Sequence, residues 1–358
     1  GLLGSSLPDF LGGAGHDPVT GALGTEELAA ECSGCAVLFG ANMLGMLPIL
    51  LSGNLGAIER FVRPVAQSWE TEHPQLAALA ATEPDVGSDF IMGHPQGRLR
   101  TRVEKKDGGY VINGRKIFIS NGSLASLVTV FASHDPTGPI RESVSCFAVP
   151  ADTKGFAVGQ VFEKMGQRAA PAAELIFDDV WVPEENRLGN EGGGFALNRL
   201  IMSVTRTPIA AIALGIARSA YEKALAYAEQ LVKDNPNDTK NLYAMANLYE
   251  KFNRITEAEQ TYEKVGGPVV QHQAIEIMLA DMAIRVEAAR GLVWSAASSL
   301  AAGKPSLKLS SMAKTFASDA AVTNALDAIQ ILGGYGYMQE YGVEKLLRDA
   351  KLTQIYEG

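Results

Sequence analysis

The stretch Lys116-Ile117-Phe118-Ile119-Ser120-Asn121-Gly122 lies near the middle of the sequence and guides the interpretation of the fold. It is rich in apolar residues, as are the runs on either side of it, Gly108-Gly109-Tyr110-Val111-Ile112-Asn113-Gly114 and Leu127-Val128-Thr129-Val130-Phe131. The Asn-Gly pairs at 113–114 and 121–122 are typical of turns between strands. We therefore predict an all-β segment over about residues 79–188, either a barrel or a small sandwich.

Helical patterns flank this segment on both sides. Residues 1 to about 78 are predicted to form a loop and then a helix that begins near Thr25-Glu26-Glu27. After about residue 195, apolar residues recur at i, i+3 and i+4 over 209–230, 269–302 and 312–332. The order of helices, strands and helices argues against a doubly wound parallel sheet. The predicted class is α+β, mostly α.

Composition excludes several functional classes. The chain has 358 residues and a net charge of −9, which argues against nucleic acid as a partner because phosphate binding needs clustered lysine and arginine. No secretory signal opens the sequence. Residues 36–58 carry no charge and are long enough for a membrane helix, but Gly40, Asn42, Gly45 and Pro48 interrupt them. We expect a buried helix pair joined by a turn, and no membrane span.

The cysteines are three in number, too few for a disulfide scaffold. Cys32-Ser33-Gly34-Cys35 has C-x-x-C spacing, but a redox or metal role would need a preceding strand or a second pair of ligands. Neither is visible, so packed or idle thiols are expected, and no metal site is predicted. Gly192-Gly193-Gly194 lacks the spacing of a dinucleotide-binding loop, which makes a Rossmann site an unfavoured interpretation.

Six motifs in order resemble those of the FAD-dependent acyl-CoA dehydrogenase family. They are Thr82-Glu83-Pro84-Asp85-Val86-Gly87-Ser88-Asp89, Phe118-Ile119-Ser120-Asn121-Gly122, Lys164-Met165-Gly166-Gln167-Arg168, Phe177-Asp178-Asp179-Val180-Trp181-Val182-Pro183, the segment 328–337 with Leu347-Arg348-Asp349-Ala350, and Tyr356-Glu357-Gly358. The resemblance covers nearly the whole chain except a polar stretch at 231–266. It implies an incomplete helical N-terminal domain (1–78), a middle β-barrel domain (79–188) and a C-terminal four-helix bundle (189–358).

The resemblance also implies a cofactor site and a reaction. FAD is expected between the β-domain and the bundle, with cofactor contacts from Thr82, Ser88, Phe118, Ser120, Gln330, Gly333 and Gly334. The reaction is α,β-dehydrogenation of an acyl-CoA to a trans-2-enoyl-CoA. Glu357 aligns with the base that takes the α-proton, and β-hydride goes to flavin N5. Arg206 is a candidate substrate-side cation, with a helix-surface arginine as the equally weighted alternative.

The sequence departs from the family pattern in several places. Ser203 stands where the family has an acid before Arg206, and the chain ends at Gly358, where the family continues with a final helix. An expected R-x-x-F-G element after about residue 230 is missing. In its place, 231–266 resembles one tetratricopeptide repeat, a helical hairpin that interrupts the bundle. A plain helical hairpin without a partner is the alternative to a chimeric, partner-binding unit.

Three functional hypotheses follow. The leading one is the dehydrogenase, with an electron-transfer flavoprotein as acceptor and a homodimer or homotetramer as the assembly. The second is a flavin-poor scaffold or chimera whose hairpin binds a protein partner. The third keeps the flavin but uses O₂ or a carrier-bound acyl group. The expected location is the cytoplasm of a bacterium, or the mitochondrial matrix in a eukaryote.

Overall fold

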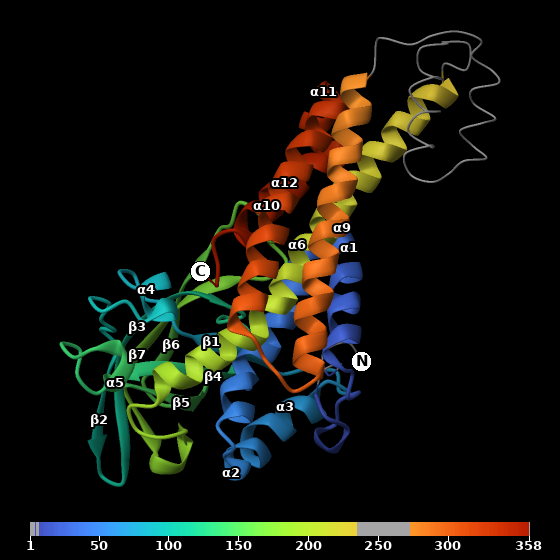
Figure 1. Ribbon diagram of the computed structural model, residues 1–358. Helices are drawn as coiled ribbons and strands as arrows, with labels where there is room; N and C mark the ends of the chain where they lie inside the picture. The colour runs from blue at the N-terminus through green and yellow to red at the C-terminus, as the bar shows by residue number, and fades with distance from the viewer. Residues whose placement is uncertain (1–3, 5–6, 235–272, 358) are drawn as a thin grey trace.

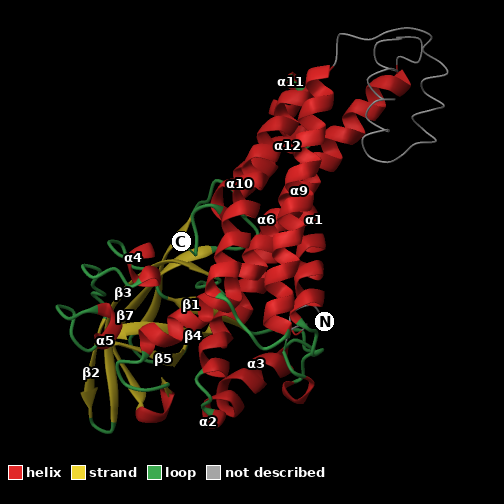
Figure 2. Cartoon of the chain, viewed as in Figure 1, coloured by secondary structure: helices red, strands yellow, loops and turns green. Residues whose placement is uncertain are grey.

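The computed structural model describes residues 4, 7–234 and 273–357 (Figure 1). The described part is an α+β fold, mostly helical, in which helices pack together on one side and a β-sheet lies beside them (Figure 2). The predicted hairpin at 231–266 lies outside the described residues except for 231–234, which belong to a long helix.

The first long helix, α1 (Pro18–Leu51), begins earlier than predicted. The side chain of Asp17 accepts hydrogen bonds from the backbone N–H groups of Val19 and Thr20, which makes Asp17 the N-cap, and Pro18 occupies the first turn. The predicted start near Thr25 is therefore wrong. Pro48 lies inside the helix, and the turn between this helix and the next comes at residues 52–54. The short helical segments α2 (Leu55–Ala57), η3 (Ile58–Val62) and α3 (Arg63–Ser68) follow.

The middle of the chain forms one eight-stranded sheet, in the order β6-β7-β3-β2-β4-β5-β8 with β1 paired in parallel to β4. The strands share a cluster of buried apolar side chains that includes Tyr110, Val128 and Phe147. The short helices α4 (Ser88–Met92) and α5 (Ile140–Ser143) lie in its connections. The strands are β1 (Leu76–Ala80), β2 (Arg102–Lys106), β3 (Gly109–Ser120), β4 (Ala125–Ser133), β5 (Val144–Pro150), β6 (Phe156–Phe162), β7 (Ala172–Pro183) and β8 (Arg187–Leu188).

Of the two turns predicted at Asn-Gly pairs, the structure contains one. Asn121-Gly122 forms the predicted turn between β3 and β4, with φ of Asn121 at 60°. The turn predicted at Asn113-Gly114 is wrong, because both residues lie inside β3. The pairing of β3 with β7 shifts register there, between Ile112 and Gly114, so the pair forms an irregularity within a continuous strand. Cross-strand pairing therefore overrides the local turn preference.

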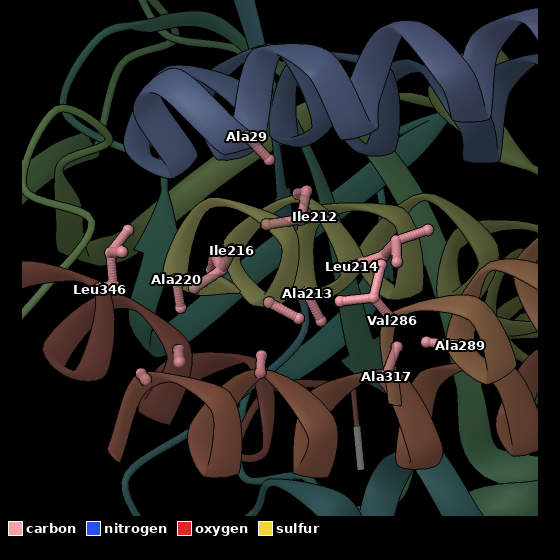
Figure 3. Close-up of a cluster of buried hydrophobic side chains, with 14 of the residues drawn as sticks. Ala29, Ile212, Ala213, Leu214, Ile216, Ala220, Val286, Ala289, Ala317 and Leu346 are labelled. Atoms are coloured by element: carbon pink, nitrogen blue, oxygen red, sulfur yellow. The ribbon is translucent and has the colours of Figure 1, made fainter. Parts of the chain in front are cut away.

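The C-terminal helices pack into a bundle with α1 against one side. They are α6 (Gly194–Asp234), α9 (Gln273–Ala301), α10 (Leu307–Leu332), α11 (Gly334–Tyr337) and α12 (Val343–Thr353). Figure 3 shows their shared core, where Ile212 and Leu214 of α6 lie among small side chains such as Ala29 and Ala317. Alanine at these positions lets the helices approach closely. Gly215 does the same, because a Cβ there would lie 2.4 Å from the carbonyl oxygen of Glu26 in α1.

Two helices have the length and apolar composition of membrane spans, Pro18–Leu51 and Gly194–Gln230. In the apolar window of each, 50% and 72% of the residues are buried inside the fold. Core helices of globular proteins have the same composition, and Figure 1 shows both helices packed against the sheet and the other helices.

Candidate active site

Glu357 follows the last helix, α12, and has a left-handed backbone conformation. The end of α12 is tied to α10, because Ser318 Oγ donates to the carbonyl oxygen of Thr353 at 2.9 Å. Beyond it the chain turns inward, and Glu357 adopts a φ of 61°, in the left-handed region that residues other than glycine seldom occupy. The residue is only 9% exposed. A buried carboxyl group in a strained backbone conformation is typical of a functional position.

Arg206 holds this residue in place from α6. Its Nε and Nη2 donate to the carbonyl oxygen of Glu357 at 2.9 and 2.7 Å, and its Nη1 donates to Ser311 Oγ at 2.6 Å. Arg206 is 4% exposed, so the alternative of a surface arginine is wrong. The guanidinium reaches the main chain of Glu357 and leaves the carboxyl group of that residue available.

The carboxyl group of Glu357 is tuned by its surroundings. Burial raises its pKa to about 7, opposed by the Thr205 hydroxyl and by the charges of Arg206 and Lys314. One carboxyl oxygen, Oε2, has no hydrogen-bond partner among the described residues. A buried carboxyl oxygen without a partner carries a desolvation cost that a bound substrate proton could relieve. This carboxyl group therefore has the pKa and the free oxygen of a general base.

A pocket of about 220 Å³ lies next to Arg206. Its apolar lining comes from α4, α6 and the start of α10, and three arginines complete it. The lining residues are Ile91, Arg141, Phe195, Arg199, Met202, Arg206 and Leu307. None of these described residues is acidic. In a chain with a net charge of −9, this local excess of cations favours an anionic ligand.

Arg141 has a fixed position in this pocket. Its guanidinium lies over the ring of Phe195, 5.5 Å from the ring centroid, and its Nε donates to the carbonyl oxygen of Gly93 at 3.1 Å. Gly93 has a φ of 63°, and a Cβ there would come within 2.3 Å of the Phe195 ring. Glycine at position 93 thus permits the stack. Arg199 forms no ion pair with any other described residue and is exposed.

The loop with Thr82 is anchored to β3 by a buried ion pair. Lys116 Nζ donates to Glu83 Oε1 at 2.8 Å, and both side chains are almost fully buried. Thr82 Oγ1 donates to the carbonyl oxygen of Ile117 at 2.6 Å, and the N–H of Ile117 donates to the carbonyl oxygen of Thr82 at 3.0 Å. The loop is therefore held rigidly beside the strand that also carries Phe118 and Ser120.

A break in that strand turns Phe118 outward. The β3–β7 register shifts between Lys116 and Ile119, and Phe118 has a φ of 59°. Its ring is 62% exposed and lies 5.0 Å from the ring of Phe162, centroid to centroid. An exposed aromatic ring fixed on a strand offers a flat apolar surface suited to a planar ring system. Ser120 is partly buried on the same strand, whereas Ser88, at the start of α4, is exposed.

The other residues predicted to bind the cofactor lie elsewhere. Gln330, Gly333 and Gly334 are exposed at the junction of α10 and α11. Figure 1 places this junction at the end of the bundle farthest from the sheet. One chain therefore does not bring these three residues together with Thr82, Phe118 and Ser120.

Asp349 of α12 connects the base to the other domains, and the sequence reasoning gave it no role. Its Oδ1 accepts from the backbone N–H of Gln167 at 2.6 Å, its Oδ2 accepts from Ser33 Oγ at 2.8 Å, and Lys345 pairs with the same carboxylate. Gly166 permits this contact, because a Cβ there would lie 2.3 Å from the carbonyl oxygen of Arg348. The turn after β6, which follows Phe162, is thus fixed to the helix that precedes Glu357.

Thr205 and Lys314 were also missed. Lys314 lies on α10 and is 3% exposed, and its charge acts on Glu357. Burial lowers the pKa of Lys314, while Glu357 opposes that shift. No sequence signal marks a lysine on an apolar helix as part of a site, because its role depends on which helix packs against it. Thr205 precedes Arg206 on α6, but consecutive helix residues point in different directions, so no sequence signal marks it either.

Three domain models of one family match most of the chain, in order. The family described as "Acyl-CoA dehydrogenase, N-terminal domain" matches residues 1–69, the middle domain 78–180 and the C-terminal domain 242–358. The chain belongs to the acyl-CoA dehydrogenase family. It is an enzyme of that FAD-dependent family, an oxidoreductase acting on CH–CH groups. These matches do not show the repeat-like character of 231–266.

Individual relatives agree with the family. The chain is 42% identical to an acyl-CoA dehydrogenase of Bacillus subtilis and 38% identical to cyclohex-1-ene-1-carbonyl-CoA dehydrogenase of Syntrophus aciditrophicus, covering 100% of this chain and 83% and 77% of those proteins. Among solved structures it is similar to butyryl-CoA dehydrogenase of Megasphaera elsdenii, with a TM-score of 0.83 and 35% identity, covering 100% of this chain and 84% of that one.

Proposed function

We propose that this enzyme dehydrogenates an acyl-CoA thioester to a trans-2-enoyl-CoA, with Glu357 as the base that takes the α-proton. The observation that carries the proposal is the state of Glu357. Its carboxyl group is buried, its pKa is raised to about 7 and its Oε2 lacks a partner among the described residues, while Arg206 holds its main chain. A base with a pKa near the working pH transfers protons efficiently.

The residues on β3 and the Thr82 loop fit a flavin. The exposed ring of Phe118 can pack against a flat ring system, and the Thr82 and Ser120 hydroxyls lie on the same rigid support. Bound FAD would supply the hydride acceptor for the β-carbon, which no amino acid side chain can provide. Ser88 would contribute a further hydroxyl from α4. We assign Gln330, Gly333 and Gly334 to the FAD of a second copy of the chain, because they lie far from this support.

The pocket beside Arg206 fits the rest of the substrate. Arg206 and Arg199 are seven residues apart on α6, about 10 Å along the helix axis. The pocket therefore runs from Arg206, which contacts Glu357, toward a cationic end formed by Arg199 and Arg141. An acyl-CoA has this polarity, with an uncharged thioester at one end and phosphates at the other. We infer that the arginines receive the phosphate-bearing arm.

Replacement of the base tests the proposal. Glu357→Gln is nearly isosteric, so the protein should stay folded and bind FAD like the wild type, while kcat falls at least about 100-fold. Glu340→Gln changes an exposed acid on the same part of the chain and should leave kcat unchanged. Near-normal turnover of Glu357→Gln with a saturating acyl-CoA and an artificial electron acceptor would disprove the assignment of the base.

The choice of electron acceptor is a second question. One similar solved structure is that of an electron-transferring flavoprotein of Acidaminococcus fermentans, at 35% identity and a TM-score of 0.82. Another is a prolyl acyl carrier protein oxidase, at 27% identity and a TM-score of 0.81. We propose an electron-transfer flavoprotein as the acceptor. O₂ consumption during turnover, with no need for an added acceptor, would favour the oxidase alternative.

A further inference from the structure

The segment Cys32-Ser33-Gly34-Cys35 breaks the regular backbone of α1. Cys32 has φ −149° and ψ 93°, extended values inside a helix, so that α1 consists of two half-helices that meet at this residue. Cys32 thus takes the position of an N-cap for the second half, and Cys35 lies three residues further on, in its first turn. C-x-x-C at the start of a helix is the arrangement that disulfide oxidoreductases use. The sequence showed the spacing but not the break.

The two thiols of this segment lie close enough for Cys32 to affect the ionisation of Cys35. The pKa of Cys35 is raised, first because its S–H donates to the sulfur of Cys32 and second because of burial, while Lys345 opposes the shift. Both cysteines are partly exposed, so a small reagent can reach them. Cys32 at the N-cap position and Cys35 in the first turn of the second half-helix are neighbours along the chain, as a short-range disulfide requires.

The residues between the cysteines hold the break in place. Ser33 Oγ donates to Asp349 Oδ2 at 2.8 Å, in the buried junction with α12. A Cβ at Gly34 would come within 2.9 Å of the Cβ of Ala169, so the backbone there packs directly on the turn after β6. These tertiary contacts therefore hold the break that places the two cysteines next to each other. Such preorganisation removes most of the entropic cost of joining them.

We propose that Cys32 and Cys35 form a redox-active dithiol that closes a reversible disulfide by exchange with a low-molecular-weight disulfide such as oxidised glutathione. One thiolate attacks the reagent, forming a mixed disulfide and releasing one thiolate. The second cysteine, on losing its proton, attacks the mixed disulfide and releases the other. The cysteine pair gives up two electrons and two protons, and the reagent's S–S bond is reduced to two thiols. The closed form fixes the break in α1 covalently.

The remaining cysteine provides an internal comparison. Cys146 is fully buried in β5, and burial raises its pKa far above the usual range. It should therefore not react in the folded protein. Any reaction of the pair without Cys146 would show that the protein stayed folded during the experiment.

The test uses the FAD-loaded protein, exposed to oxidised glutathione under native conditions, quenched with an alkylating agent and analysed by peptide mass spectrometry. The expected product is an intramolecular Cys32–Cys35 disulfide that dithiothreitol reverses. Cys32→Ser and Cys35→Ser should each stop at a single glutathione adduct, and Cys146→Ser should behave like the wild type. The disulfide should raise the melting temperature by roughly 2–4 °C, a shift that is absent in Cys35→Ser.

Three results would overturn the proposal. They are a stable glutathione adduct on Cys32 or Cys35 of the wild type, unreactive thiols in the folded protein, and a disulfide that involves Cys146. The test does not depend on the proposed dehydrogenase reaction, because its readouts are mass and melting temperature.

Discussion

Arg206 binds Glu357 through the main-chain carbonyl oxygen of that residue, while its charge acts on the carboxyl group. Two guanidinium nitrogens donate to the carbonyl oxygen of Glu357, at 2.9 and 2.7 Å, although the carboxyl group of the same residue lies close by. The arginine thus fixes the position of the base and lowers the carboxyl pKa only in part. A direct ion pair would hold the carboxylate in its charged form and weaken it as a base.

Changes to this contact should therefore act on turnover. Arg206→Lys keeps a positive charge but cannot make the two-pronged contact, so we expect kcat to fall about 10–100-fold while FAD affinity stays near the wild-type value. Ser311→Ala removes the hydrogen bond from Arg206 Nη1, together with the bond of Ser311 to the carbonyl oxygen of Leu307, and should cost less than about 10-fold. Steady-state kinetics and flavin titration measure both quantities. Equal losses in the two variants would mean that the contact with Glu357 has no special role.

The raised pKa of Glu357 predicts a pH profile. The base works when deprotonated, so kcat/KM should rise with pH through about 7 and then level off. Burial favours the neutral form, and the folded pKa lies above the ordinary value of 4.5. The stabilising effect of the neutral carboxyl group is therefore fully present below pH 4.5 and is lost as the pH rises through about 7.

Denaturation of the FAD-free protein tests the direction of the pKa shift of Glu357 independently of activity. Glu357→Gln should match the wild type in free energy of unfolding near pH 4.5 and exceed it at pH 8. A profile whose rising limb lies near pH 4.5, or a variant that is less stable at pH 8, would show that the carboxyl group is charged in the folded protein across this range.

Arg199 should distinguish substrates by their carrier. Arg199→Gln removes a cation from the far end of the pocket, so KM for an acyl-CoA should rise about 10-fold or more. The same acyl group on uncharged pantetheine should be oxidised with an unchanged kcat/KM. Arg102→Gln, at an exposed strand position, serves as the matched control and should change neither value. A similar loss on both thioesters would contradict recognition of the phosphates.

Asp349 should contribute to the free energy of unfolding, although it takes no part in the proposed reaction. Asp349→Asn removes the charge that accepts from Gln167 and Ser33, and we expect the free energy of unfolding to fall by about 1.5–3 kcal/mol. Ser33→Ala deletes one of these contacts and should cost less, about 0.5–1.5 kcal/mol. Urea denaturation at pH 7 measures both. If Ser33→Ala proves as costly as Asp349→Asn, the carboxylate does not organise this junction.

Local sequence was enough to predict the character of most elements. Apolar periodicity over 209–230 and 312–332 predicted helices, and α6 and α10 contain these ranges. The Asn121-Gly122 turn was likewise found, because its neighbours in sequence suffice to form it. The motif order identified the family, and the chain belongs to it.

Features that depend on contacts between residues distant in sequence could be seen only in the tertiary structure. Asn113-Gly114 stayed within β3 because β7 pairs alongside it, and Phe118 turned outward because that pairing slips by a residue. Glu357 has a raised pKa because α6 and α10 enclose it, and Arg206 is buried because the chain end reaches it from 151 residues away. Burial, register and long-range contacts follow from how the elements pack, which no local pattern of residues encodes.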